Sequence, residues 1–151
     1  MSISNTLLIE TQMTPFEVRE MLISNDLGLM AAPYDRLRGE GVHVGIGTEN
    51  QFGQDVTFDE HGFRPSLHII FDLDSDEDEE EGKRITGRAT AALLRKDPGE
   101  AVLLFNGEKP ILKKCDGRII VRNGWGEDWL KPALNEINME YEVSDFVPTG
   151  F

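Results

Sequence analysis

The sequence predicts an α+β fold in which two main helices pack against one mostly antiparallel sheet. Two amphipathic helical stretches alternate with short apolar runs of strand length. After the second helix, Asn106-Gly107 and Asp116-Gly117 separate three such runs, and both dipeptides are favoured in two-residue hairpin turns. The 151 residues fit one domain over 1–151, and a hydrophobic content of 39% is enough to build its core.

The first half of the chain predicts a strand, a helix and a second strand. Residues 7–9, Leu-Leu-Ile, form the first apolar run. A helix begins at residues 14–17, Thr-Pro-Phe-Glu, where the threonine caps, the proline suits the first helical position and the glutamate completes a capping box. It is expected to end within 25–28. Alternation over 42–46 predicts the next strand, whereas the rest of region 33–62 has no clear pattern.

The second half predicts the most regular strand and the longest helix. Alternate residues of 66–74 are apolar, so one face of this strand is expected to be buried. A helix is predicted over 76–96, with Ser75 as its N-cap and residues 97–99, Asp-Pro-Gly, as its end. Each half therefore has the order strand, helix, strand, which predicts two β-α-β-type halves.

A meander of strands follows the second helix. Its strands are expected at 102–105, 111–115 and 118–121. Pro110 has no N–H to donate to a sheet, so a bulge or a sheet edge is predicted there. Residues 125–137 predict a short helix or a loop, and residues 140–143 predict a last strand.

The charge of the chain is concentrated in one segment. The sequence has 28 acidic and 15 basic residues, a net charge of −13, and eight of the ten residues at 72–81 are acidic. We call residues 72–81 the acidic segment. Because negative charge repels phosphates, this composition argues against direct binding of nucleic acid or of an anionic membrane. It favours either a solvated helix start, where acids oppose the helix dipole, or a surface that captures a basic protein.

Calcium binding is not predicted for the acidic segment. Asp72, Asp74 and Asp76 alternate like the first ligands of an EF-hand loop. That loop requires glycine at its sixth position and glutamate at its twelfth, where this sequence has Glu77 and Lys83. The spacing therefore excludes an EF-hand.

The sequence predicts neither an enzyme nor a cofactor or metal site. His43, His61 and His68 lack the short spacing of metal ligands, and no nucleophile elbow or phosphate-binding loop is present. The lysines beside Cys115 would lower the pKa of its thiol, although a single strand cysteine is usually inert. The alternative that stays open is a small-molecule or cation-binding module, which would need a pocket where the histidines converge.

The sequence favours a cytoplasmic location. With one cysteine, the chain cannot form an internal disulfide. Residues 1–6 lack the features of a signal peptide, and no apolar run approaches the roughly 20 residues that span a bilayer.

Three stretches together resemble a known family. They are Phe-Arg-Pro-Ser-Leu at 63–67, Ala-Ala-Leu-Leu-Arg at 91–95 and Val-Leu-Leu-Phe-Asn-Gly-Glu at 102–108. In this order and spacing they resemble the Sit-type immunity proteins of the swarmer-inhibition and related polymorphic toxin systems of bacteria. The resemblance implies a cytoplasmic, non-enzymatic protein that neutralises a cognate toxin by direct binding. The heavy acidic run at 75–81 and the region 33–58 depart from the family pattern.

The two departures supply the candidate toxin-binding residues. Charge on such a surface mainly raises the rate of association with a basic partner, whereas aromatic and arginine side chains usually anchor an interface. The expected partner is a toxin domain with a basic surface. The candidates are Asp74, Asp76, Glu77, Asp78, Glu79, Glu80 and Glu81 in the acidic segment, and Tyr34, Arg36 and Phe52 in the unmatched region.

Overall fold

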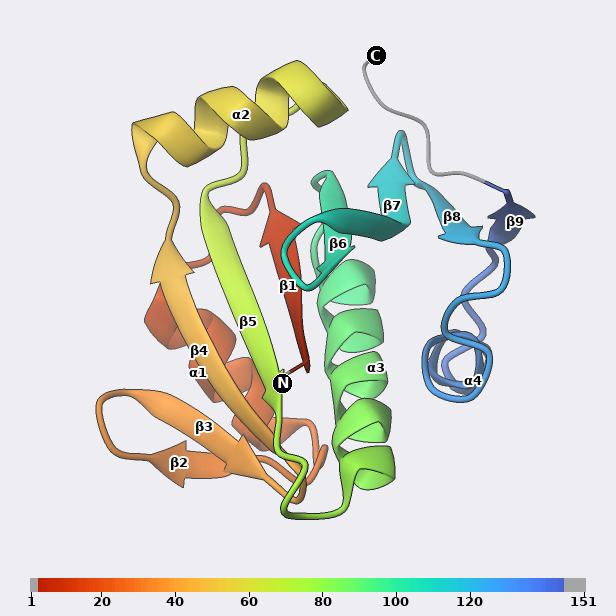
Figure 1. The fold of residues 1–151 in the computed structure, drawn as a ribbon. Helices are drawn as coiled ribbons and strands as arrows, with labels where there is room; N and C mark the ends of the chain where they lie inside the picture. The colour runs from red at the N-terminus through yellow and green to blue at the C-terminus, as the bar shows by residue number, and fades with distance from the viewer. Residues whose placement is uncertain (1–2, 146–151) are drawn as a thin grey trace.

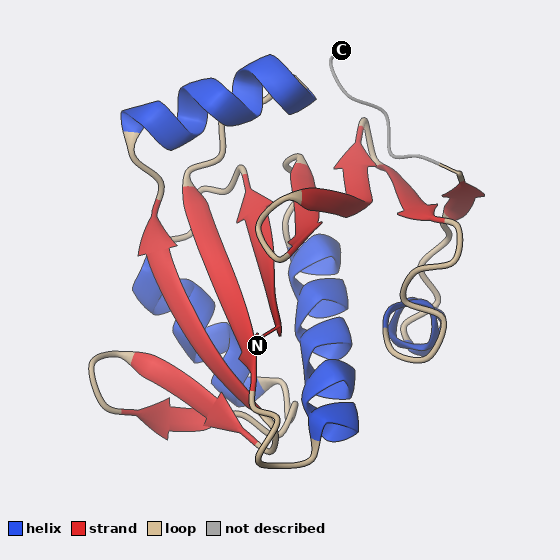
Figure 2. Ribbon diagram, viewed as in Figure 1, coloured by secondary structure: helices blue, strands red, loops and turns tan. Residues whose placement is uncertain are grey.

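The computed structural model describes residues 3–145, which form one nine-stranded sheet and four helices (Figures 1 and 2). The strand order is β2-β3-β4-β5-β1-β6-β7-β8-β9, and every pair is antiparallel except β8–β9. The strands are β1 Ile3–Ile9, β2 Met30–Ala32, β3 Arg36–Gly39, β4 Val42–Thr48, β5 Leu67–Leu73, β6 Ala101–Phe105, β7 Lys109–Cys115, β8 Arg118–Arg122 and β9 Glu142–Ser144. The helices are α1 Pro15–Ser24, α2 Gln51–His61, α3 Glu79–Lys96 and α4 Leu130–Glu136.

Two interlocked β-α-β units form the centre of the sheet. Strand β1 lies between β5 and β6, which α3 connects. Strand β5 lies between β1 and β4, whose connection contains α1. This is the split β-α-β arrangement, and it confirms the predicted α+β class with two β-α-β-type halves. The β2–β3 hairpin extends the sheet beyond β4, and β7 to β9 extend it beyond β6.

The two faces of the sheet have different surroundings. Alternate residues of β5, including Ile69 and Phe71, belong to the main core with apolar residues of α1, α3 and α4. We call this the covered face. The opposite side, the open face, carries His68 and Ile70 of β5 and has α2 at one end, beside β4 and β5 (Figure 1). A smaller apolar cluster that includes Leu8 lies on the open face.

Two adjacent lysines of β7 hold the C-terminal ends of two helices. Because neighbouring strand residues point to opposite faces, Lys113 reaches the open face and Lys114 reaches the covered face. The Nζ atom of Lys113 donates to the carbonyl of His61 at the end of α2, at 2.6 Å. The Nζ atom of Lys114 donates to the carbonyl of Leu94 near the end of α3, at 2.7 Å. Helix C-termini favour cations because their last carbonyls lack helical partners.

The helix starts confirm one prediction and correct another. Thr14 caps α1 with a complete capping box, as predicted. The predicted start of the second helix is wrong, because α3 begins at Glu79 and its N-cap is Asp78, not Ser75. The Asp74 carboxylate accepts from the backbone N–H of Asp76 at 2.9 Å, forming a turn that competes with helix.

The meander follows the predicted turns with one difference. Asp116 and Gly117 both have positive φ and join β7 to β8 directly, as expected for this dipeptide. Asn106 and Gly107 also have positive φ, but Glu108 lengthens that connection to three residues. The register shifts between Leu103 and Leu104, opposite the segment that contains Pro110, so the predicted bulge is confirmed.

The predicted strand at 42–46 is confirmed as β4, but the sequence did not reveal the other elements of region 33–62. The β2–β3 turn uses positive φ at Tyr34 and Asp35, without a glycine to signal it. Helix α2 has only two buried residues, so its hydrophobic periodicity is weak. Its ends do carry signals: the Asn50 side chain accepts from the N–H of Gly53, and Gly62 adopts the left-handed conformation at the C-cap.

Candidate functional site

The acidic segment lies against the turn between β3 and β4. The backbone N–H of Asp74 donates to the carbonyl of Gly41 at 2.9 Å. The Glu77 carboxylate accepts from the N–H of Gly41 at 2.9 Å and from Nη2 of Arg38 at 2.6 Å. The hydrogen bond from Gly41, followed by that from Arg38, lowers the pKa of the Glu77 carboxyl. Glu77 therefore fastens the acidic segment to the sheet.

Two glycines allow this contact. A Cβ atom on Gly82, in the first turns of α3, would lie 2.2 Å from the carbonyl oxygen of Gly41. A Cβ atom on Gly41 would lie 2.0 Å from the carbonyl oxygen of Asp78, and Gly41 also has a φ of +75°. Only glycine at both positions lets the turn and the helix approach this closely.

Most acidic side chains in the acidic segment have partners. Asp78 caps α3, and the basic groups of the neighbourhood each lie near carboxylates of this segment. The ion pairs are Arg38–Glu77 at 2.6 Å, Lys83 with Glu79 at 3.8 Å and with Glu80 at 3.5 Å, and Arg84–Glu81 at 2.6 Å, and Nε2 of His43 lies 3.5 Å from Oδ2 of Asp74. Within residues 3–145, the exposed carboxylates of Asp72 and Asp76 have no ion-pair partner. The unpaired charge of the acidic segment is therefore smaller than the sequence indicates.

The remaining candidate residues are exposed but lie in separate places. Tyr34 is 95% exposed in the β2–β3 turn, and Arg36 is exposed at the start of β3. Phe52 is 77% exposed on α2. Helix α2 lies at one end of β4 and β5, whereas the acidic segment leaves β5 at the other end (Figure 1). The structure therefore does not bring Phe52 together with the acidic segment.

A groove that no sequence pattern predicts lies between α2 and the open face of the sheet. Its volume is about 630 Å³. Leu8, Ile70 and Leu104, from β1, β5 and β6, form an apolar floor, and Phe52 and Val56 of α2 form a wall. We call this the α2 groove. Detecting it required the strand order, because its floor comes from residues far apart in the sequence.

Two of the three histidines line the α2 groove. The Nδ1 atom of His68 lies 2.6 Å from Oε2 of Glu49, and a Cβ atom on Gly47 would lie 2.6 Å from Nε2 of the same ring. Burial, followed by the charge of Lys113, lowers the pKa of His61 to about 4. His61 is therefore neutral at pH 7.

His43 does not join the other two histidines. It lies beside Asp74, at the acidic end of the sheet, and its strand neighbour on β5 is Asp72. The convergence of three histidines that a small-molecule or cation site would need is therefore not formed.

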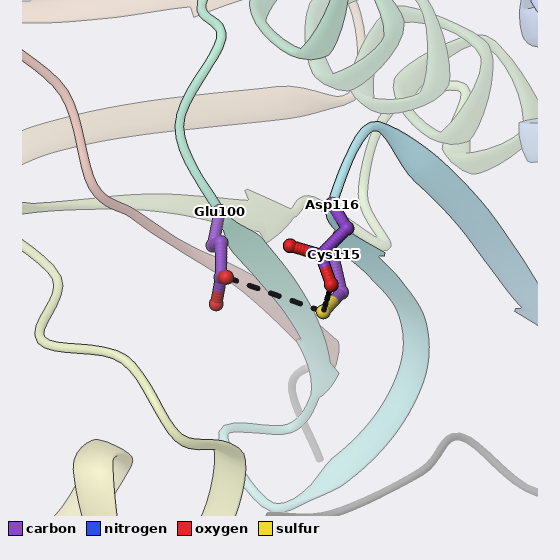
Figure 3. A group of neighbouring side chains, drawn as sticks. All are labelled: Glu100, Cys115 and Asp116. Atoms are coloured by element: carbon purple, nitrogen blue, oxygen red, sulfur yellow. Dashed lines mark hydrogen bonds between the residues drawn. The ribbon is translucent and has the colours of Figure 1, made fainter. Parts of the chain in front are cut away.

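The thiol of Cys115 is surrounded by carboxylates rather than by the lysines beside it in sequence. Its Sγ atom lies 4.0 Å from Oε1 of Glu100 and 3.8 Å from Oδ2 of Asp116 (Figure 3). Burial, followed by the charges of Glu100 and Asp116, raises the pKa of the Cys115 thiol, and burial raises the pKa of Glu100 as well. The predicted net lowering of this pKa is wrong, because burial and the two carboxylates outweigh the opposing charge of Lys113, whose amino group binds the carbonyl of His61.

The group around Cys115 offers three potential metal ligands. One atom from each of Glu100, Cys115 and Asp116 lies within 4.8 Å of the others. A metal requires a deprotonated thiol, whereas this environment favours the protonated form. We therefore interpret the group as a hydrogen-bonded thiol with little nucleophilic character.

Comparison with known proteins identifies one match. A family model described as SitI3-like matches residues 3–132, from β1 into α4, which includes the acidic segment and the α2 groove. Searches of curated proteins and of solved structures found no match. Within residues 3–145, no helix combines the length and the hydropathy that a membrane crossing requires.

Proposed function

The chain belongs to the SitI3-like family, and on that basis we propose that it is an immunity protein that neutralises a cognate bacterial toxin by direct protein–protein contact. The family match over residues 3–132 carries this proposal. The role requires no chemistry of its own, since tight binding is enough to block an active site or an essential surface of the toxin. We further propose that it acts in the cytoplasm as a single domain over residues 1–151.

We propose that the acidic segment accelerates association with a basic surface of the toxin. Opposite charges steer two proteins together and raise the association rate, an effect that salt screens. Asp76 and Glu80 support this role, because both are exposed, and Asp76 has no ion-pair partner within residues 3–145. Glu77 is a poorer test of it, because Glu77 also fastens the segment to Gly41.

The proposed function predicts a toxin reading frame beside this gene, and that toxin provides the test. Cells that express the toxin should survive when the protein is co-expressed, and the purified proteins should form a complex. Survival without complex formation, or a complex without protection, would contradict neutralisation by binding.

Charge reversal tests the role of the acidic segment. Asp76→Lys with Glu80→Lys should slow association about tenfold at low salt and less at high salt. Glu20→Lys with Glu140→Lys is a matched control, since it makes the same change in net charge at exposed sites outside the acidic segment. Equal rates for the two double variants would exclude a specific role for the acidic segment.

A further inference from the structure

We propose that the α2 groove is the docking site for an apolar, positively charged segment of the toxin. This inference rests on the proposed function and adds the surface and the chemistry of the segment that it binds. It places the main contact on the open face, at the opposite end of β5 from the acidic segment.

The α2 groove has apolar surface that the rest of the described chain leaves uncovered, chiefly on Phe52 and Val56, because Leu8 and Leu104 of its floor are buried. Phe52 and Val56 lie one helical turn apart on the same side of α2. Phe52 is 77% exposed, although it stands beside the apolar floor formed by Leu8, Ile70 and Leu104. Exposed aromatic side chains next to a concave apolar surface are typical anchors of a protein interface.

The charge of the α2 groove indicates which segment would fit. Among the described residues that line it, Glu49, Glu60 and Glu108 are acidic and none is lysine or arginine. Lys113 lies below His61 and is buried, with its Nζ bound to the carbonyl of His61. A segment that places a lysine or arginine beside an apolar side chain would match both the carboxylates and the floor.

The sheet beside the groove has room for a bound segment. Gly45 pairs with Ile70 of the groove floor, and a Cβ atom added to Gly45 would meet no atom within 4 Å. The open face beside the groove is therefore unobstructed at Gly45 of β4. A groove that continues onto an unobstructed part of the sheet fits an extended segment of a protein better than a small compact molecule.

Binding measurements with the purified toxin test the proposal with two variants, one that removes an apolar side chain and one that adds a side chain. Phe52→Ala removes an anchor and Gly45→Leu adds bulk to the open face, so each should weaken binding about tenfold or more. Phe16→Ala is the matched control, because Phe16 is a 65% exposed phenylalanine on α1, which packs on the covered face. It should change affinity less than threefold. Circular dichroism and thermal melting establish that each variant is folded.

The outcomes distinguish failure of toxin binding itself from failure of the α2 groove as the docking site. If the wild-type protein does not bind the toxin, the proposed function fails. If the wild-type protein binds and the Phe52 and Gly45 variants bind equally well, the proposed function stands and the α2 groove is not the docking site.

Photo-crosslinking tests the chemistry of the occupant. With a photoreactive phenylalanine analogue at position 52, the crosslinked toxin peptide should contain lysine or arginine beside apolar residues. The same analogue at position 16 should give little crosslinking. A crosslinked peptide that is acidic, or equal crosslinking from both positions, would overturn the proposal.

Discussion

The two faces of the sheet use the same strands for different purposes. On the covered face, Phe71 and Leu103 have no exposed surface and pack with three helices. On the open face, their strand neighbours Ile70 and Leu104 line a groove beside a single helix, α2. Because successive strand residues alternate between faces, the same strands stabilise the fold on one side and line an apolar groove on the other. The following predictions test this division.

Adjacent residues of β5 should differ most in their effect on stability. Phe71→Ala should lower the free energy of unfolding by about 3–5 kcal/mol, because it leaves a cavity in the main core. Ile70→Ala should cost about 1 kcal/mol, because Ile70 is only partly buried on the open face. Urea unfolding of both variants measures the difference. Similar losses would show that the two faces are equally packed.

Replacing a helical glycine with alanine should change the free energy of unfolding by an amount that depends on which atoms lie beside the added methyl group. Alanine usually stabilises a helix by about 1 kcal/mol relative to glycine. Gly82→Ala should instead destabilise the protein by about 2–3 kcal/mol, because the methyl group would meet the Gly41 carbonyl. Gly53→Ala, on α2, meets the Glu49 side chain rather than backbone, so Glu49 can shift at the expense of its contact with His68, and the cost should be smaller, about 1 kcal/mol.

Urea unfolding of Gly82→Ala and Gly53→Ala measures the difference between their free energies of unfolding. A stabilising Gly82→Ala would contradict the close contact between α3 and the β3–β4 turn.

Elements whose structure depends on residues adjacent in the sequence could be predicted, and elements that depend on distant residues could not. Helix α1 and the Asp116-Gly117 turn were predicted because their capping and turn residues are adjacent in sequence. The β2–β3 turn was missed, since it places Tyr34 and Asp35 at positive φ without a glycine. Helix α2 was missed, because a helix at one end of an open face needs few buried residues and so has weak periodicity.

The candidate site was harder to predict, because its properties depend on distant residues. The acidic segment could be located from composition, but its pairing with Arg38 and its contact with Gly41 depend on the strand order. The α2 groove likewise combines residues of β1, β5, β6 and α2. Phe52 was selected as an aromatic candidate, but nothing in the sequence connects it with Leu8 or Leu104.

The histidine at the end of α2 should make stability depend on pH between 7 and 5. His61 has a pKa of about 4 when folded and about 6.5 when unfolded, so in this range only the unfolded chain gains the proton. Lowering the pH from 7 to 5 should therefore reduce the free energy of unfolding by about 2 kcal/mol. His61→Leu should remove this part of the pH dependence, as measured by urea unfolding at both pH values.

Glu100 also titrates toward this window, because burial raises the pKa of its carboxyl, and its contribution to stability has the opposite sign to that of His61. Hydrogen bonds with arginine side chains or with the N–H of Gly41 lower the pKa values of Asp55, Glu77 and Glu136. Their contribution is present above their unfolded pKa values, near 4, and is lost as the pH falls further. An unchanged pH profile in His61→Leu would assign the dependence to groups other than His61.

The smallest expected change in stability comes from substituting valine for two glycines of β4 on the open face, and the two substitutions should have opposite signs. Gly45→Val should raise the free energy of unfolding by about 0.5–1 kcal/mol, because valine suits a strand and its Cβ meets no atom within 4 Å. Gly47→Val should lower it, because its Cβ would lie 2.6 Å from Nε2 of His68 and disturb the ring's contact with Glu49. Thermal melting of both variants measures the signs. A destabilising Gly45→Val would mean that the open face is covered at this position, which would remove the room that docking requires.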